Sequence, residues 1–321
     1  MLDYTDEANS YLYQHTLKES FTVMGRGLHT GIKTIMSVLP GEPDTGYVFV
    51  RRDIHPSRAK IVARWNTVVD TKLCTTVGNS LGVRVSTVEH LLAALYACGV
   101  DNAHIVLDGP EVPIMDGSAK DFAFLIKKSG TRRQNQQRRA IVIRKKISAR
   151  DGHKFVQLSP HRHTKLSIGI QFESKAIGTQ YISMTLNREH FHRHIAQART
   201  FGFSEHLDTL ASLGYGKGGS IKNAILVDGD KVKNEEGLRF KDEFVRHKYL
   251  DAVGDLALAG ARVIGHFTGV ASGHQLNNAI LHELMIDEEA RVFTTVRNAY
   301  LNWSRLMYLP ENDTVPFSYQ N

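Results

Sequence analysis

The sequence lacks most features of secreted, membrane-spanning or disulfide-rich proteins. Only two of its 321 residues are cysteines, Cys74 and Cys98, which excludes a disulfide framework and favours a reducing compartment. No apolar run approaches the roughly 18 residues needed to span a bilayer, and the nearest, residues 91–100, has the length of a core helix. The opening residues MLDYTDEANS are polar and acidic, without a signal-peptide pattern. We therefore expect a cytoplasmic protein.

Nucleic-acid-binding motifs are also absent, although the chain is basic. Forty Lys and Arg against 33 Asp and Glu give a formal net charge of +7, which favours anionic partners such as phosphates or acidic membrane surfaces. Aromatic residues are not interleaved with the basic ones, so we expect no nucleic-acid partner. Hydrophobic residues at 42% and charged residues at 23% are typical of a globular protein.

The predicted elements fall into two similar series. The first contains strands in residues 14–62, a helix at 86–98, a strand at 103–108 and a helix ending at 128. The second contains strands at 140–147, 154–158 and 166–172, helices at 188–197 and ending near 213, a strand at 221–227, a helix at 240–256, a strand at 262–270 and a helix ending near 289. We predict two α+β domains, residues 1–130 and 140–321, joined by a polar, basic linker at 131–139.

The predicted helix at residues 240–256 carries a regular set of polar side chains. His247, Asp251 and Asp255 recur every fourth residue, which places all three on one face, and Asp242 is a suitable N-cap. A His and an Asp at this spacing can bind one metal ion. The alternative is a solvated polar face with a helical ion pair.

The predicted helix at residues 86–98 is apolar along most of its length, so we expect it to be buried. Ser86 and Glu89 fit a capping box, and Gly99 fits a helix end. Glu89 therefore has a structural explanation. His90 has none, because burying an unpartnered polar group is costly.

Together the two helices supply the ligands that a hydrolytic zinc site requires. His90, His247 and Asp251 offer two imidazoles and a carboxylate, and leave a fourth position for water. Zinc would lower the pKa of that water to about 7.

Acid and base candidates lie nearby in the sequence. Glu89 adjoins a ligand and is a candidate base, and His274 follows Ser-Gly at a predicted helix start. Pairing with Asp255 would keep His274 protonated, although Asp255 as an ordinary exposed carboxylate is the alternative. No serine nucleophile elbow occurs, and Cys98 lies in the apolar helix. Cys74 has polar neighbours and either approaches a site or has a structural role.

Glycine-rich segments do not match nucleotide-binding fingerprints. Residues 25–31 have Thr30 where the third glycine belongs, and residues 214–220 lie between a helix and a strand, the reverse of the required order. We interpret residues 25–31 as a turn that displays His29.

Nine short stretches occur in one order along the chain: GLHTG (27–31), STVEHL (86–91), PIMDGS (113–118), ARTFG (198–202), GLRF (237–240), DEFVRHK (242–248), LDA (250–252), GDL (254–256) and SGH (272–274). In this order the chain resembles the UDP-3-O-acyl-N-acetylglucosamine deacetylases of lipid A synthesis, the LpxC family. The resemblance extends from about residue 16 to about residue 289 and is very specific.

The resemblance implies a role for each site residue. It implies that His90, His247 and Asp251 bind zinc (Zn2+), with Glu89 as general base and His274 as general acid. It further implies that Asp255 orients the acid and that the Thr200 hydroxyl helps to hold the reacting carbonyl. The candidate substrate contacts are Lys248 and Phe201, which the resemblance implies, together with His29 and Phe172.

The family fold implied is α+β, with two domains whose helices are sandwiched between two sheets. A hydrophobic passage for the acyl chain should include residues 203–226. The implied reaction removes acetate from UDP-linked acylated N-acetylglucosamine, and we expect a monomer with peripheral contact to the inner membrane surface. The alternatives are a deacetylase of another N-acetylated sugar nucleotide and a non-catalytic sugar-nucleotide-binding paralogue.

Three departures from the family pattern surround the expected substrate site. Residues 173–175 replace a His-Pro pair, Ala271 replaces a basic residue, and Arg26 replaces a small apolar one. They affect the expected nucleotide affinity and acyl-chain preference, but not hydrolysis.

Overall fold

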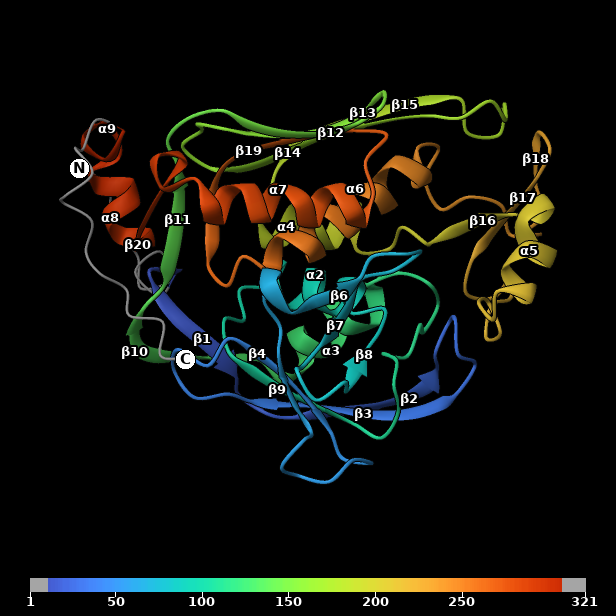
Figure 1. The fold of residues 1–321 in the computed structure, drawn as a ribbon, viewed down its shortest axis with the longest axis horizontal. Helices are drawn as coiled ribbons and strands as arrows, with labels where there is room; N and C mark the ends of the chain where they lie inside the picture. Colours follow the sequence, from blue (N-terminus) through green and yellow to red (C-terminus); the bar gives the residue numbers. More distant parts are fainter. Residues whose placement is uncertain (1–10, 308–321) are drawn as a thin grey trace.

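The computed structural model describes residues 11–307, in which a layer of helices lies between two sheets (Figure 1). The first sheet has the order β2 (Phe21–Arg26), β3 (Lys33–Pro40), β9 (Ala103–Leu107), β4 (Tyr47–Arg51) and β5 (Lys60–Val62). Its β4 and β9 are parallel, and its other neighbours are antiparallel. The predicted α+β architecture with sandwiched helices is confirmed.

The second sheet covers the opposite side of the helices. Its strands are β12 (Ile147–Asp151), β13 (Lys154–Ser159), β19 (Arg262–Val270), β11 (Arg139–Ile143) and β20 (Arg291–Thr295), with β14 (Thr164–Gln171) and β15 (Thr179–Thr185) joined through β19. Strand β19 is central, because it pairs in parallel with β11 and β14 and antiparallel with β13. The strands predicted in this half are confirmed, with shifted ends.

The helices of the middle layer are buried because a sheet covers each side of them. The longer helices are α2 (Glu89–Ala97), α3 (Lys120–Ser129), α6 (Glu243–Ala257) and α7 (His274–Ile286). Shorter ones are α4 (Arg188–His190), which continues as a π-helical turn at Phe191–Ile195, α5 (Leu207–Ser212), α8 (Val296–Leu301) and α9 (Trp303–Leu306). Every residue of α2 is buried, and α6 leaves only Arg246 and Lys248 partly exposed. None of the helices in residues 11–307 is both long and apolar enough to cross a membrane.

Three smaller sheets complete the described chain. They are the pair β1 (Tyr13–Leu17) and β10 (Thr131–Gln137), the set β6 (Val68–Asp70), β7 (Thr76–Gly78) and β8 (Arg84–Val85), and the set β16 (Phe201–Phe203), β17 (Ile225–Asp228) and β18 (Lys231–Val232). The strand predicted from residue 221 begins only at Ile225. The C-terminal region left unassigned contains β20, α8 and α9, and residues 308–321 and 1–10 lie outside the described part.

Two local predictions need correction. Helix α2 begins without a capping box: Val88 is the N-cap and makes no side-chain cap. The Ser86 hydroxyl instead accepts a hydrogen bond from Thr76, and the Glu89 carboxylate accepts one from the backbone N–H of Thr75. Glu89 is thus oriented by a neighbouring strand segment rather than by its own helix.

The polar segment predicted as a linker is largely extended structure. Its residues 131–137 form β10, which pairs antiparallel with β1. Only Gln134 of this strand is buried, which explains why no apolar pattern signals it. The division into two domains at residues 131–139 stays a prediction.

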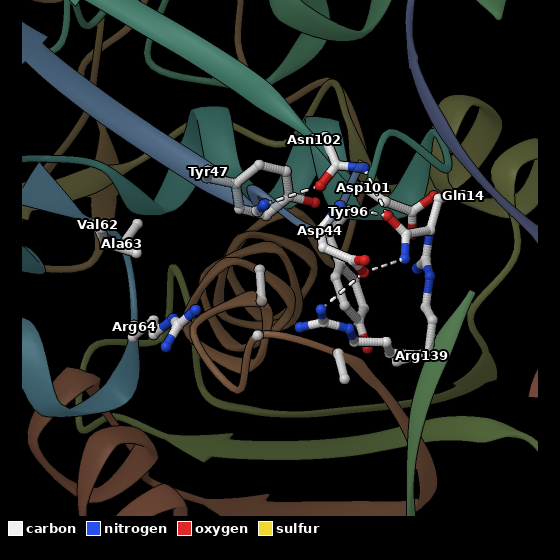
Figure 2. Close-up of a pocket in the computed structure, with 15 residues that line it drawn as sticks. Gln14, Asp44, Tyr47, Val62, Ala63, Arg64, Tyr96, Asp101, Asn102 and Arg139 are labelled. Atoms are coloured by element: carbon white, nitrogen blue, oxygen red, sulfur yellow. Dashed lines mark hydrogen bonds and ion pairs between the residues drawn. The ribbon is translucent and has the colours of Figure 1, made fainter. Parts of the chain in front are cut away.

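Polar side chains join the two halves beside the end of α6 (Figure 2). Arg139 forms an ion pair with Asp44 at 2.7 Å, and Gln14 donates to the same carboxylate at 2.7 Å. Asn102 donates to Gln14 at 2.8 Å. Because these groups satisfy one another and the cavity between them has only about 50 Å³, this junction is structural.

Helices α2 and α6 touch backbone to backbone at Gly254. A Cβ atom at this position would lie 2.1 Å from the carbonyl oxygen of Glu89. Only glycine therefore permits the observed approach. The contact places the first turn of α2, with Glu89 and His90, against the face of α6 that carries His247 and Asp251.

We predict that Gly254→Ala lowers the free energy of unfolding by about 1–3 kcal/mol, because the added methyl group overpacks the contact between the helices. Urea denaturation followed by circular dichroism measures this change. The matched control is Gly202→Ala, since nothing lies within 4 Å of a Cβ placed there. Equal stability of the two variants would contradict the close contact.

Candidate metal centre and catalytic cleft

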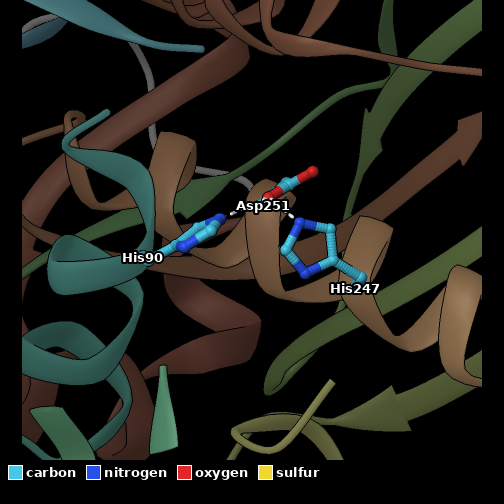
Figure 3. Close-up of side chains that lie close together, drawn as sticks. All are labelled: His90, His247 and Asp251. Carbon is cyan, nitrogen blue, oxygen red and sulfur yellow. Dashed lines mark ion pairs between the residues drawn. The ribbon is translucent and has the colours of Figure 1, made fainter. Parts of the chain in front are cut away.

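His90 of α2 and His247 and Asp251 of α6 converge between the two helices (Figure 3). One candidate ligand atom from each residue lies within 4.8 Å of the others. The Oδ1 atom of Asp251 is 3.3 Å from Nε2 of His247 and 3.7 Å from Nε2 of His90. This buried oxygen has no hydrogen-bond partner within residues 11–307, so the three groups surround a point that a cation can occupy.

Burial keeps both imidazoles in the form that binds metals. Burial, with the nearby His247, lowers the pKa of His90 to about 3, and burial also lowers the pKa of His247. The Nδ1 atom of His247 donates to the carbonyl of Ala198 at 3.0 Å, which leaves Nε2 as the ligand atom.

The carboxylate of Asp251 stays ionised at neutral pH. Burial opposes ionisation, but His247 and the ammonium of Lys248 outweigh it and hold the pKa of Asp251 below its ordinary range. Lys248 donates to Oδ2 of Asp251 at 2.8 Å, which leaves Oδ1 facing the imidazoles. Two neutral imidazoles and one carboxylate are a donor set that fits zinc.

Glu89 lies beside the ligands at the start of α2. Its Oε2 atom accepts from the backbone N–H of Thr75 at 3.0 Å, and its Oε1 atom lies 3.8 Å from Nε2 of His274. Burial raises the pKa of Glu89 to about 8, although His274 opposes this shift. A pKa near neutrality suits a group that accepts a proton and later releases it.

His274 begins α7 and faces Glu89 across the site. Its Nδ1 atom lies 2.9 Å from Oδ2 of Asp255, the position that the predicted pairing requires. Burial would lower the pKa of His274, but Asp255 and Glu89 outweigh it and raise the pKa to about 9. The ring is therefore protonated at pH 7. Asp255 is itself fixed by the hydroxyl of Thr75 at 2.6 Å and the amide of Asn277 at 2.8 Å.

Thr75 and Asn277 are the site residues that sequence patterns missed. Asn277 lies three residues after His274 and therefore shares its helix face, and this spacing was the available signal. Thr75 has no comparable signal, because the polar stretch around it draws attention only to Cys74. That thiol is buried and is absent from the cleft lining in the described chain, and burial raises its pKa to about 12.

A cleft of about 370 Å³ opens onto these groups, a size suited to a small-molecule ligand. The predicted site residues that line it are His29, Glu89, His90, Thr200, Phe201, His247, Lys248, Asp251 and His274. Thr200 is held at the wall because its N–H donates to the carbonyl of Gly117 at 2.8 Å. Gly117 has φ +86°, and a Cβ there would lie 2.0 Å from the carbonyl oxygen of Asn223.

The predicted substrate contacts differ in position. Both ring nitrogens of His29 are buried and lack hydrogen-bond partners among the described residues, so they are available to a ligand. Phe172 does not line the cleft. Its ring packs against Phe201 and Phe203 instead, with centroids 5.8 Å and 5.5 Å apart, and so supports the cleft wall from behind.

The departures from the family pattern lie at and around the cleft. Ala271 lines it with φ +48°. Arg26 donates to the carbonyl of Gly31 at 3.0 Å, within the turn that displays His29. The loop at 173–175 is farther along, where Ser174 donates to the carbonyl of Gly229.

The chain is similar to one family along most of its length. The family model described as "LpxC: UDP-3-O-acyl N-acetylglycosamine deacetylase" matches residues 14–286. A UDP-3-O-acyl-N-acetylglucosamine deacetylase of Phenylobacterium zucineum (strain HLK1) is 46% identical over 279 residues, which cover 87% of this chain and 95% of the relative. Proteins of the same name from Geobacter sp. (strain M21) and Haemophilus influenzae (strain 86-028NP) are 46% and 45% identical and cover 85% and 88% of this chain, and 89% and 93% of their own lengths. The chain therefore belongs to the LpxC family of UDP-3-O-acyl N-acetylglycosamine deacetylases.

Proposed function

We propose that this protein is a zinc-dependent amidohydrolase that removes the acetyl group of UDP-3-O-acyl-N-acetylglucosamine in lipid A synthesis, giving acetate and the free amine. One observation carries the mechanism: a complete ligand set opens onto a cleft in which a carboxyl group and a protonated imidazole face each other 3.8 Å apart. Membership of the deacetylase family supports the substrate class.

His90, His247 and Asp251 would hold the metal. When bound, zinc would polarise the acetyl carbonyl, lower the pKa of a water ligand and favour the carboxylate form of the neighbouring Glu89. Lys248 supports this centre through its hydrogen bond to Asp251, which orients the free oxygen toward the imidazoles.

Glu89 and His274 divide the proton transfers. Glu89 accepts a proton from the attacking water as the water oxygen bonds to the acetyl carbon. The Thr200 hydroxyl, at the cleft wall, donates a hydrogen bond to the negative charge that develops on the carbonyl oxygen. His274 then donates its proton to the amine nitrogen as the carbon–nitrogen bond breaks, while Asp255 keeps the ring oriented and charged.

The remaining cleft residues would receive the substrate. Phe201, Lys248 and His29 line the side where we place the sugar and nucleotide, and Phe172 supports Phe201. Residues 203–226 would contribute to the acyl passage. We further propose a cytoplasmic monomer whose net charge of +7 supports peripheral contact with the anionic inner membrane surface.

Glu89→Gln should retain zinc but lose about 100-fold to 10,000-fold in kcat, because the amide cannot accept the proton. A deacetylation assay on the UDP-linked substrate, combined with metal analysis, measures both properties. Glu288→Gln is the matched control, since that side chain is 90% exposed and far from the site in sequence. Near-full turnover by Glu89→Gln would rule out the assigned base.

His247→Ala should weaken zinc binding by more than about 100-fold, since loss of a ligand exceeds the cost of losing a group that merely supports one. Competition with a fluorescent chelator measures the affinity. His190→Ala, which removes an exposed imidazole, should bind zinc normally. Chelation should abolish wild-type activity and zinc should restore it; activity of the metal-free wild type would refute zinc dependence.

Asp255→Asn should shift the basic limb of the kcat profile to lower pH and reduce kcat by roughly tenfold. The general acid must be protonated, so a pKa of about 9 keeps it competent until pH rises through that value. Removing the negative charge lowers this pKa, and the acid is then lost earlier as pH rises. A basic limb that does not move would show that Asp255 does not set the charge of His274.

A further inference from the structure

A second polar cavity lies at the opposite end of α2 from the metal centre. It has a volume of about 610 Å³ and adjoins Gly99, just beyond the last turn of the helix. The nine residues of α2 separate this end from Glu89 and His90 by roughly 13 Å. The cavity is therefore distinct from the catalytic cleft and shares no lining residue with it.

Three guanidinium groups meet at this cavity. A Cβ atom placed on Gly99 would lie 3.4 Å from Nη2 of Arg188, 3.7 Å from Nη2 of Arg138 and 3.9 Å from Nη2 of Arg262. These arginines come from the start of α4, the junction of β10 and β11, and the start of β19. We call the space that they line the arginine cavity.

Positive charge exceeds negative charge in this region. Arg138 pairs with Asp101 at 2.9 Å, and no Asp or Glu is among the described residues that line the cavity. Arg138 and Arg188 also donate to the carbonyls of Gly99 and Cys98 at the end of α2, where the helix dipole is equivalent to roughly half a negative charge. One carboxylate and a helix end do not balance three guanidinium groups.

Capping of α2 explains only part of the cluster. Arg262 makes no contact with the helix-end carbonyls in the described chain; its guanidinium carbon lies 4.1 Å from the ring centroid of Tyr96. Arg138 is 2% exposed, and its buried Nη1 atom has no hydrogen-bond partner within residues 11–307. A buried charged donor without a partner is costly, so its place beside a cavity indicates a ligand that supplies acceptor oxygens.

We propose that the arginine cavity binds a phosphate-bearing anion. Guanidinium groups bind phosphate oxygens in a bidentate manner, and three of them match its charge and multiple acceptors. The volume admits a phosphate carried on a larger molecule, and His163, Tyr11 and Tyr300 in the lining offer rings for its organic part. Because the three arginines all lie at the end of the helix that carries Glu89 and His90, such a ligand would stabilise the fold around α2.

Calorimetric titration of the full-length protein with inorganic phosphate, at constant ionic strength, tests the site. We expect one phosphate bound per chain and a binding constant weakened about tenfold or more in Arg188→Gln, because a charge-assisted contact is lost. Arg193→Gln removes the same charge from an exposed arginine on the adjoining turn and should change binding by less than about twofold. Undetectable binding by the wild type, or equal binding by Arg188→Gln, would overturn the proposal.

A second set of variants covers misfolding and binding elsewhere. If Arg188→Gln loses its circular dichroism spectrum, Arg262→Lys replaces it, because lysine keeps the charge but cannot form the bidentate contact. Phosphate binding that is abolished by Lys248→Ala but unaffected by either arginine variant would assign the anion to the catalytic cleft and contradict the arginine cavity. Binding that depends on the arginines and survives Lys248→Ala supports it.

Two further probes identify the source of the phosphate. Adenosine monophosphate represents a soluble nucleotide, and phosphatidylcholine vesicles containing phosphatidic acid represent a lipid headgroup. Displacement of inorganic phosphate by only one of them, in wild type but not in Arg188→Gln, supports the site and assigns that source. Displacement by both, with the same dependence on Arg188, supports a site that reads the phosphate group alone.

Discussion

The backbone contact between α2 and α6 at Gly254 is the constraint on which the metal centre depends. It brings the carbonyl of Glu89 against α6, and so sets the distance between His90 on one helix and His247 and Asp251 on the other. Both helices are enclosed by two sheets, where isolated polar groups are costly. The structure answers that cost by pairing the polar groups with one another, except for the Asp251 oxygen that faces the two imidazoles and remains for a cation.

The acid and the base belong to a single hydrogen-bonded unit. Thr75 supplies its backbone N–H to Glu89 and its hydroxyl to Asp255, and Asp255 in turn orients His274. Opposite environments result for the two proton carriers: burial raises the pKa of Glu89, whereas two carboxylates outweigh burial and raise the pKa of His274. Separate elements therefore hold an acid and a base side by side in forms suited to proton transfer.

Spacing within one helix was the strongest information in the sequence, because four-residue intervals fix a helix face whatever surrounds it. It predicted α6 and its polar face, and His90 stood out because a buried helix gives it no structural role. Contacts between distant segments had no such signal. The capping box was wrong because Thr75 orients Glu89, and the strand at 131–137 was missed because β1, more than a hundred residues away, provides its partner. Phe172 was placed correctly near Phe201 but not in the cleft, since its position depends on the packing of three rings.

The central claim is that the two helices bind zinc through His90, His247 and Asp251 and leave one position open. X-ray absorption spectroscopy at the zinc edge of the loaded protein tests it most directly. The account predicts two imidazole nitrogens at about 2.0–2.1 Å and oxygen ligands from one carboxylate and one solvent molecule at about 2.0–2.2 Å, with no sulfur. A sulfur ligand at about 2.3 Å, or a fourth protein ligand in place of the solvent molecule, would contradict it.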